Sequence, residues 1–423
     1  MTSPPRTSLR PLHVVVAGGG IAGVETLLAL RALTGDALSI TLVSPAEQLH
    51  YRPFAVLEPF TSRAIRRYDL DEVCDDLDVT HRLDALAAVD RAERTILMEG
   101  GERIAYDALV LAPGAHASCG LGRAHTFFAD ADPGSLHWIV AELEQGMTRR
   151  VAFVVPPGPT WPLPLYELAL MSAARTRDMG VRDVELTLVT PEDSPLGLFH
   201  GAGSAAVADQ LSQAGIAFAG STYAHDYDGR TLVLTPGERT LAAERVVALP
   251  VLSGPAIGGV PSDADGFVHV DEHGRVPGVP DVYAIGDATT FAIKQGGMAA
   301  QQADAVATLI ARSAGVSIPE PSTRPLLRAM LFTGDGPIYL RATIAGGESV
   351  VSSASRHCPW WPPHKVAARY LAPYLADRDE SDRSTVRRHL RAVPAEGVGT
   401  GPAAVVHHDG DPGGIELLGR DRQ

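Results

Sequence analysis

The amino-acid sequence predicts an α/β protein with doubly wound parallel sheets and a small C-terminal α+β domain. Its 423 residues are enough for two or three domains, and 45% hydrophobic with 20% charged residues is a globular composition. Short β-branched runs alternate with stretches of helical hydrophobic spacing over about 300 residues, which is typical of parallel sheets covered by helices. Beyond Arg324 this alternation gives way to short strands separated by glycine turns.

The first strand, helix and strand form one βαβ unit. Residues 13–17 are a short apolar run, residues 24–33 carry apolar side chains at helical spacing, and residues 39–43 are the next apolar run. We expect the two strands to be parallel, with a right-handed crossover. A second βαβ unit begins at residue 151, which indicates a duplicated architecture. The other expected elements are a helix at 165–177 and strands at 107–112, 151–155, 184–189 and 245–249.

The C-terminal part has a different texture. Trp360 and Trp361 precede a stretch, 365–375, that has helical spacing. This stretch is expected either to pack in the core or to form an amphipathic face at a quinone entry or a bilayer surface. Residues 392–423 are rich in Gly, Pro, Ala and Asp with little periodic hydrophobicity, which predicts a disordered tail.

Charge and cysteine content exclude several classes of protein. The formal net charge of −14 argues against a nucleic-acid-binding surface. Cys74, Cys119 and Cys358 form no CxxC pair, which indicates a reducing, cytoplasmic location without disulfides, and we interpret the last two as small buried residues. No histidine or cysteine spacing predicts a metal site. The uncharged stretch 246–262 contains three prolines, which disfavours a membrane-spanning helix and leaves at most peripheral membrane contact.

A glycine-rich turn after the first strand carries the strongest functional signal. In Gly18-x-Gly20-x-x-Gly23 the first glycine permits a sharp turn, the second lets a pyrophosphate approach the backbone, and the third allows close packing of helix on strand. The start of the helix, with Ile21 and Ala22, presents free N–H groups and a partial positive charge to the phosphates. This context predicts dinucleotide binding rather than a purely structural turn.

The end of the second strand departs from the usual pattern. A carboxylate normally holds the ribose hydroxyls at this position. Here the sequence reads Val43-Ser44-Pro45-Ala46-Glu47. We therefore expect Ser44 or the later Glu47 to take that role.

Two distant segments make the pattern specific. Ala112-Pro113-Gly114 resembles the Ala-Thr-Gly turn of flavoproteins with two dinucleotide-binding domains, and Val282-Tyr-Ala-Ile-Gly-Asp287 resembles their second FAD motif. Over residues 12–375 the sequence is similar to the pyridine nucleotide-disulfide oxidoreductase superfamily, and within it to the sulfide:quinone oxidoreductase and type II NADH dehydrogenase branch. In the sulfide:quinone enzymes a serine often replaces the ribose-binding acid, as Ser44 does here.

The resemblance implies a bound FAD. It assigns the Asp287 carboxylate, beside Gly286, to a hydroxyl of the flavin chain, and the alternative role is an Asx turn or a helix cap. It directs the start of the helix at Gln295 and Gly297 toward the flavin N1 and C2 carbonyl, where N–H groups and the helix dipole stabilise the reduced ring. Lys294 either adds a positive charge there or is a solvated surface lysine. The other expected cofactor contacts are Arg52, Ala112 and Gly114.

The resemblance also implies two Rossmann-like dinucleotide-binding domains, one inserted in the other. The FAD-binding domain would comprise residues 12–114 and 244–322. The inserted NAD(P)-binding-like domain would cover 115–243. A C-terminal domain would follow at 323–391, before the tail at 392–423.

Several cysteines of the related enzymes are missing. Disulfide reductases of the superfamily carry Cys-x4-Cys in the first domain, whereas residues 51–59 contain no cysteine, which excludes a thiol–disulfide relay there. Cysteines of the sulfide:quinone enzymes would fall near Phe128, Trp161 and Phe332, and none of these is a cysteine. Oxidation of sulfide by the polysulfide route is therefore not expected.

The second nucleotide-like turn is unusual as well. Residues 156–164 contain five prolines and Trp161 where a GxGxxG turn would stand, and proline offers no N–H to a phosphate. This composition predicts a rigid loop closing over the flavin instead of a conventional NAD(P)H site. Glu167 and Glu192 leave an unconventional nicotinamide mode open.

The sequence as a whole predicts an FAD-dependent oxidoreductase that passes electrons from an unidentified small-molecule donor to a quinone-like acceptor. The flavin supplies the redox chemistry, and the protein supplies orientation and charge. One alternative is an NAD(P)H:acceptor reductase, and another is a flavin-binding sensor or structural module without turnover. No nucleic-acid partner is expected, and a homodimer stays open.

Overall fold

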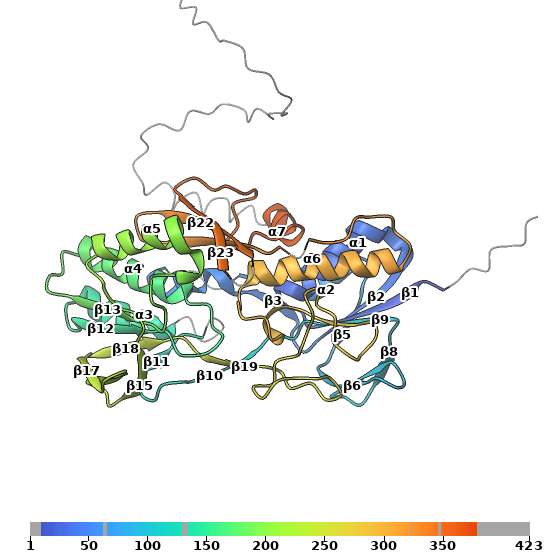
Figure 1. Cartoon of the computed structure of the whole chain (residues 1–423), viewed down its shortest axis with the longest axis horizontal. Coiled ribbons are helices and arrows are strands. Elements are labelled where there is room, and N and C mark those ends of the chain that lie inside the picture. Colours follow the sequence, from blue (N-terminus) through green and yellow to red (C-terminus); the bar gives the residue numbers. More distant parts are fainter. Residues whose placement is uncertain (1–9, 62–65, 129–133, 323, 346–347, 379–423) are drawn as a thin grey trace, which may run out of the picture.

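Two parallel sheets form the two halves of the molecule in the computed structural model (Figure 1). The structure describes residues 10–61, 66–128, 134–322, 324–345 and 348–378. The first sheet has the strand order β20-β9-β1-β2-β5, and the second has the order β11-β18-β12-β13-β14. This arrangement confirms the predicted α/β fold class.

The first sheet begins with the predicted βαβ unit. Strand β1 pairs in parallel with both β2 and β9, and β20 joins at the far side of β9. Helices α1 and α6 pack against each other along this sheet (Figure 1). The elements are β1 (Leu12–Ala17), α1 (Ile21–Thr34), η1 (Gly35–Ala37), β2 (Leu38–Ser44), β5 (Thr80–Leu83), β9 (Ala108–Leu111), β20 (Val282–Ala284) and α6 (Gly296–Ser313).

The second sheet repeats the same plan with other residues. Strand β12 pairs in parallel with β13 and β18, and β11 and β14 extend the sheet on either side. The predicted helix at 165–177 is present and begins two residues earlier. The elements are β11 (His125–Thr126), α3 (Gly134–Glu144), β12 (Arg150–Val154), α4 (Leu163–Asp178), β13 (Glu185–Val189), η3 (Gly197–Phe199), α5 (His200–Gln213), β14 (Ala217–Ala219) and β18 (Arg245–Ala248).

Smaller antiparallel sheets and short helices connect and flank these two sheets. The hairpin sheets are β3 (Gln48–Tyr51) with β4 (Arg66–Asp69), β6 (Leu86–Asp90) with β7 (Thr95–Met98) and β8 (Arg103–Ala105), β10 (His116–Ser118) with β19 (Val251–Ser253), and β15 (Tyr223–Tyr227) with β16 (Thr231–Thr235) and β17 (Arg239–Ala242). The short helices are η2 (Arg52–Phe60), α2 (Leu70–Asp76) and η4 (Gly286–Ala288).

The C-terminal part forms a three-stranded antiparallel sheet, as its glycine-punctuated sequence predicts. Strands β21 (Leu326–Phe332), β22 (Pro337–Ala345) and β23 (Glu348–Ser355) pair in that order. This sheet lies between the two halves in Figure 1, with β22 and β23 close to α5. The limits of the three predicted domains stay a prediction, and the predicted tail at 392–423 lies outside the described residues.

The prediction of a helix at 365–375 places the start of this helix too early in the chain. Helix α7 covers Leu371–Arg378, and the residues before Leu371 are extended or bent. Their backbone N–H groups bind the carboxylate of Glu25 on α1, so a distant side chain fixes where the helix starts. Leu371 and Leu375 are fully buried in the core shared with α1 and α6, whereas Trp361 is 89% exposed. Within the described part of the chain, no helix combines the length and the apolar character needed to cross a bilayer.

Candidate functional site

The first glycine-rich turn is tightly packed on one side and open on the other. Gly18 has φ +124°, and a Cβ there would stand 2.1 Å from the carbonyl oxygen of Ala112. A Cβ on Gly23 would stand 1.8 Å from the oxygen of Gly18. A Cβ on Gly20, in contrast, would meet no atom within 4 Å. Two of the three glycines are therefore required by packing, while the third borders free space.

The second predicted FAD motif lies beside this turn. Ile285 donates its N–H to Leu111, which joins β20 to the neighbouring strand. Gly286 has φ +68°, and a Cβ there would lie 3.4 Å from Cβ of Ala22 at the start of α1. It would also lie 3.3 Å from Cβ of Ala299 near the start of α6. Two helix N-termini and two motifs separated by more than 250 residues thus meet at the carboxyl ends of parallel strands, where dinucleotides bind in such folds.

Asp287 supplies a carboxylate at this meeting point. Its residue is half-buried, and no hydrogen-bond donor from the described residues reaches its side chain, which speaks against the capping and Asx-turn alternatives. Burial raises the pKa of Asp287, while the nearby charges of Lys294 and Arg52 act in the opposite direction. The carboxylate is therefore available to accept a hydrogen bond from a ligand.

Lys294 lies inside the protein, so the alternative of a solvated surface lysine is wrong. Its side chain is 5% exposed, its ammonium donates to the carbonyl of Thr289, and Nζ lies 3.9 Å from the ring centre of Phe267. Burial lowers the pKa of Lys294 to about 8, and the carboxylates of Asp287 and Asp263 oppose that shift. A positive charge is thus held a short distance from Asp287.

Gln295 and Gly297 form the N-terminal turn of α6. Oε1 of Gln295 accepts the N–H of Met298 at 2.8 Å, and its Nε2 donates to the carbonyl of Arg328 at 2.9 Å. Both ends of this amide are engaged, so the side chain caps the helix. A Cβ on Gly297 would stand 3.0 Å from Oε1 of Gln295, which explains the glycine at that position.

The remaining predicted cofactor contacts are distributed around the same turn. Ser44 is buried, and a Cβ on Gly19 would lie 2.7 Å from its hydroxyl, so Ser44 borders the glycine-rich turn. The side chain of Glu47 is exposed at the start of the next hairpin. Ala112 is buried and donates its N–H to Ala17. Two further expected residues are Arg52, exposed at the start of η2, and Gly114, with φ +81°.

A family model for pyridine nucleotide-disulphide oxidoreductases matches residues 12–130 and 167–305, which is more than half of the chain. The chain belongs to this family. The predicted superfamily is thereby confirmed, and with it the class of oxidoreductases. The roles of individual residues stay predictions.

Comparisons with single proteins agree with this membership. The sulfide-quinone reductase of Aquifex aeolicus is 27% identical over 196 residues, which are 43% of this chain and 43% of that relative, so less than half of the relative's length is matched. The crystal structure of a sulfide:quinone oxidoreductase from Aquifex aeolicus superimposes with a TM-score of 0.72, 21% identity and coverage of 89% of this chain and 92% of that chain. A ferredoxin reductase from Rhodopseudomonas palustris superimposes with a TM-score of 0.58, 21% identity and coverage of 79% and 83%. The structural likenesses show the fold.

This family member contains a buried ion pair that sequence reasoning missed. Glu167 on α4 and Lys365 before α7 are both buried, with Oε2 and Nζ 2.5 Å apart. Oε1 of Glu167 accepts the N–H of Phe332, and Nζ of Lys365 lies 4.6 Å from the Phe332 ring centre. Burial raises the pKa of Glu167 and lowers that of Lys365, and their attraction opposes both shifts. The sequence contained only a weak indication of this pair: Glu167 is an acid in an otherwise apolar helix, and Lys365 is one of only two lysines in the chain.

The proline-rich turn leaves few N–H groups at the start of α4. Leu165 donates its N–H to Pro162, and Pro164 has none to offer. Trp161 lies edge-on to the buried ring of Phe199, with ring centres 6.2 Å apart. Glu192 stands at the position where an acid would hold a second ribose. Its Oε2 accepts hydrogen bonds from the hydroxyls of Tyr166 at 2.7 Å and Thr190 at 3.1 Å, and its Oε1 accepts the N–H of Gly197 at 3.1 Å. Among the described residues, the groups that would bind a second nucleotide are therefore missing, as the N–H groups at the start of α4 are, or already hydrogen-bonded, as the carboxylate of Glu192 is.

The three cysteines lie apart from one another. Cys74 is buried and Cys358 is half-buried, with its thiol donating to Trp360. Cys119 is exposed, so the interpretation of this residue as a small buried one is wrong. It lies on a loop directly after the short edge strand β10, where the chain runs along the surface. Among the described residues no cluster of His, Cys, Asp or Glu could hold a metal ion.

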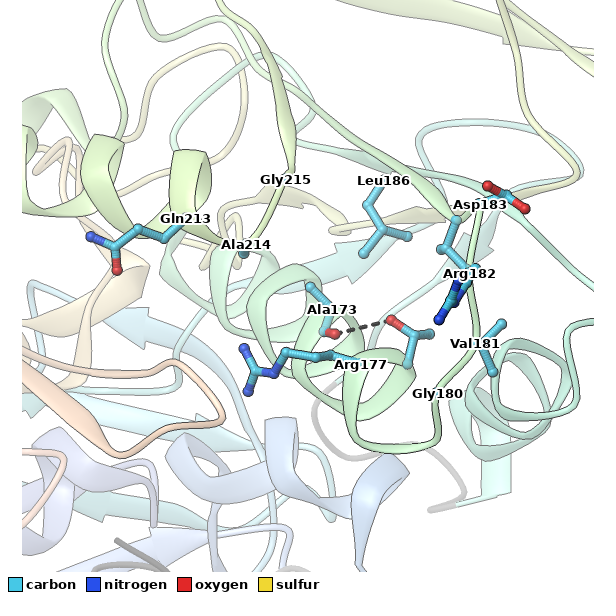
Figure 2. Close-up of a pocket in the computed structure, with 12 residues that line it drawn as sticks. Ala173, Arg177, Gly180, Val181, Arg182, Asp183, Leu186, Gln213, Ala214 and Gly215 are labelled. Carbon is cyan, nitrogen blue, oxygen red and sulfur yellow. Dashed lines mark hydrogen bonds between the residues drawn. The ribbon is translucent and has the colours of Figure 1, made fainter.

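A cavity of about 500 Å³ lies in the second half of the molecule and does not belong to this site. Figure 2 shows Arg177, Gly180 and Asp183 near the end of α4, with Gln213 at the end of α5 on its other side. The cavity therefore borders the C-terminal ends of two helices and the beginning of β13. Nucleotides bind beyond the opposite, carboxyl ends of such strands, so this cavity is not a candidate nucleotide site.

Proposed function

We propose that the chain is an FAD-dependent oxidoreductase that passes electrons from a small-molecule donor through the flavin to a quinone-like acceptor. One observation supports this proposal above others: the open glycine turn of α1, a half-buried carboxylate and the N-terminus of α6 share one location. A diphosphate, a polyhydroxyl chain and a ring that gains negative charge on reduction need this set of partners.

In this proposal the residues around the turn bind and orient the cofactor. The bare backbone at Gly20 and the N–H groups of Ile21 and Ala22 hold the diphosphate. The Asp287 carboxylate accepts a hydrogen bond from a hydroxyl of the linker between diphosphate and ring. Ser44, with its hydroxyl at the glycine turn, is the candidate for the adenosine ribose, and the exposed Glu47 is less favourably situated.

The N-terminal turn of α6 supplies charge complementarity. Bound FAD supplies two-electron redox chemistry. The N–H groups at the start of α6 and the buried ammonium of Lys294 stabilise negative charge, which collects on the ring when it is reduced. Gln295 acts indirectly in this proposal, because its amide is occupied in holding the first turn of the helix.

The acceptor and donor follow from more indirect observations. The matched relative is named a sulfide-quinone reductase, which supports a quinone as acceptor. The positions expected to carry the sulfur-relay cysteines hold Phe128, Trp161 and Phe332, so a donor other than sulfide is favoured.

The test is an absorbance measurement on the purified protein. We expect a yellow protein whose flavin spectrum bleaches on anaerobic reduction, and a colourless protein that does not take up added FAD would refute the proposal. Asp287→Ala should lose most of the flavin. Asp36→Ala is the matched control, because the Asp36 side chain is 96% exposed, and it should retain the flavin.

A second candidate is an NAD(P)H:acceptor reductase. It is supported by the parallel β12–α4–β13 unit, which keeps the arrangement of a nucleotide-binding fold. The engaged Glu192 and the prolines before α4 weigh against it. Anaerobic mixing with NADH, NADPH and sulfide, side by side, separates the candidates, because a pyridine nucleotide should bleach the flavin only in this second case. A flavin-bound protein that no donor reduces would favour the sensor alternative.

A further inference from the structure

Residues 366–378, here named the strap, run from the start of α6 past α1 to α2. The strap begins where Val366 donates its N–H to the hydroxyl of Tyr51. Its side chain lies 3.1 Å from the place a Cβ would take on Gly296, at the start of α6. At its far end Arg378 binds Glu72 and Asp76 on α2. The strap therefore contacts the N-terminus of α6 through Val366 and is anchored on two other helices.

Its central anchor is a single buried carboxylate. Glu25 on α1 is fully buried and accepts the N–H groups of Arg369 at 2.8 Å, Tyr370 at 3.0 Å and Leu371 at 2.5 Å. Three N–H donors at the start of α7 favour a negatively charged acceptor. Removal of this acceptor would leave three backbone groups without partners.

A second carboxyl group lies against the first. The side chain of Asp304 on α6 lies next to that of Glu25, and each carboxyl group acts on the pKa of the other. Two neighbouring carboxylates repel each other in a buried place when both are ionised, so the closed arrangement favours a proton on one of them. Glu25 already accepts three donors, whereas Oδ1 of Asp304 has no partner among the described residues. Asp304 is therefore the more favourable carrier of this proton, and its O–H can donate a hydrogen bond to Glu25.

We propose that Glu25 and Asp304 form a protonation-dependent latch that holds the strap in place. While Asp304 is neutral, its O–H donates to Glu25 and the carboxylate keeps its three backbone partners. When Asp304 loses its proton, two adjacent carboxylates repel each other in a buried place, and release of the strap relieves this repulsion. Because Val366 of the strap lies against the start of α6, opening of the strap would make the flavin site more accessible, a consequence that rests on the proposed function.

The neighbouring charges do not remove this repulsion. Arg369, on the strap itself, acts on Asp304 and is exposed to solvent, and among the described residues Tyr370 is the other titratable group that interacts with the pair. Burial and the Glu25 carboxylate raise the pKa of Asp304 to about 8. Burial also raises the pKa of Glu25, which its hydrogen bonds from the strap oppose.

The sign of the pH effect follows from these groups. A pKa of Asp304 that is higher in the closed state than in the open one means that opening releases a proton. Opening therefore becomes easier as the pH rises toward about 8, by up to about tenfold per pH unit, and levels off above that value.

Hydrogen–deuterium exchange of the full chain tests the latch. The protection of amides in a peptide covering 366–378, corrected for the intrinsic pH dependence of exchange, should fall at least tenfold between about pH 6 and pH 8. A peptide from β12 serves as the internal control and should keep its protection. Asp304→Asn keeps the size of the side chain and a donor toward Glu25 but cannot ionise, so its strap should show no such fall.

A wild-type strap with the same protection at both pH values would overturn the proposal. An equal fall in Asp304→Asn would overturn it as well. Flavin content, read from the absorbance of the same samples, is a separate result. A flavin-free protein with a pH-dependent strap would refute the proposed function and leave the latch standing, and a yellow protein with a pH-independent strap would do the reverse.

Discussion

At the scale of single residues, the glycines of the first turn differ in whether packing of the protein requires them. Gly18 and Gly23 are close to backbone atoms that a methyl group would strike, whereas Gly20 faces open space at a backbone conformation that alanine adopts easily, with φ −82°. One motif thus contains residues that the fold requires and a residue that only a ligand would require. The sequence pattern alone does not distinguish these two kinds of glycine.

This difference gives a matched pair of substitutions. Gly20→Ala should leave the thermal unfolding midpoint within about 2 °C of wild type, since a surface substitution changes stability by less than ~0.5 kcal/mol. It should lose flavin, because the methyl group occupies the place of the diphosphate. Gly23→Ala should destabilise the protein by several kcal/mol, since the new Cβ would overlap the oxygen of Gly18. Flavin absorbance and calorimetry check both, and full flavin content in Gly20→Ala would contradict the assigned role.

The buried lysine beside Asp287 predicts a pH dependence of the flavin potential. Lys294 has a pKa lowered to about 8, so it is charged below that pH and neutral above it. A charged Lys294 should raise the two-electron midpoint potential relative to Lys294→Met by about 30 mV, or ~1.4 kcal/mol. This difference should shrink as the pH rises through about 8. Lys294→Arg stays charged, so the difference between its midpoint potential and that of Lys294→Met should persist at high pH. The same dependence of the midpoint potential on pH in all three proteins would exclude an effect of this charge.

At the scale of elements, the strands and helices of both βαβ units could be predicted because each carries its own hydrophobic period. The start of α7 could not, because the N–H groups that precede it bind Glu25, some 345 residues earlier in the chain. The pairing of Glu167 with Lys365 joins α4 to the segment before α7 across a gap of 198 residues. Local sequence patterns contain no information on such long-range contacts. The glycine and aspartate motifs of the candidate site are runs of neighbouring residues, so they could be recognised in the sequence.

The contact between α4 and the segment before α7 should depend on keeping both charges. Glu167→Ala or Lys365→Ala should lower the free energy of unfolding by about 3–5 kcal/mol, because each leaves an unpaired charge in the core. The double replacement Glu167→Leu with Lys365→Met should recover most of that loss, since it removes both charges and keeps the volume. Denaturant unfolding measures the three values. Asp183→Asn is the control, because this aspartate belongs to an ion pair and its side chain is 85% exposed, and it should change the free energy of unfolding by less than ~1 kcal/mol. Equal losses of stability in the single and double variants would contradict the ion-pair account.

At the scale of the whole molecule, the candidate site is assembled from segments that span most of the chain. The turn of α1 comes from the first 25 residues, and the Ala112 turn comes from the end of β9. Asp287 and the start of α6 come from beyond the second sheet. The family pattern predicted that these segments meet, and the strand order β20-β9-β1 explains how they do. A ligand held by all of them would connect parts of the chain that only the completed sheet brings together.

Such a ligand should therefore stabilise the folded state as a whole. FAD added to the flavin-depleted protein at about 100 times its dissociation constant should add about 2.7 kcal/mol to the free energy of unfolding, because the unfolded chain has no assembled site. The unfolding midpoint should rise with FAD concentration, and the described helices α1 and α6 should gain protection together. Adenosine diphosphate, which lacks the flavin and its linker, reaches the turn at Gly20 but not Asp287, so it should stabilise less. An equal shift from both ligands would locate binding at the first turn alone and exclude a contribution from Asp287 and the start of α6.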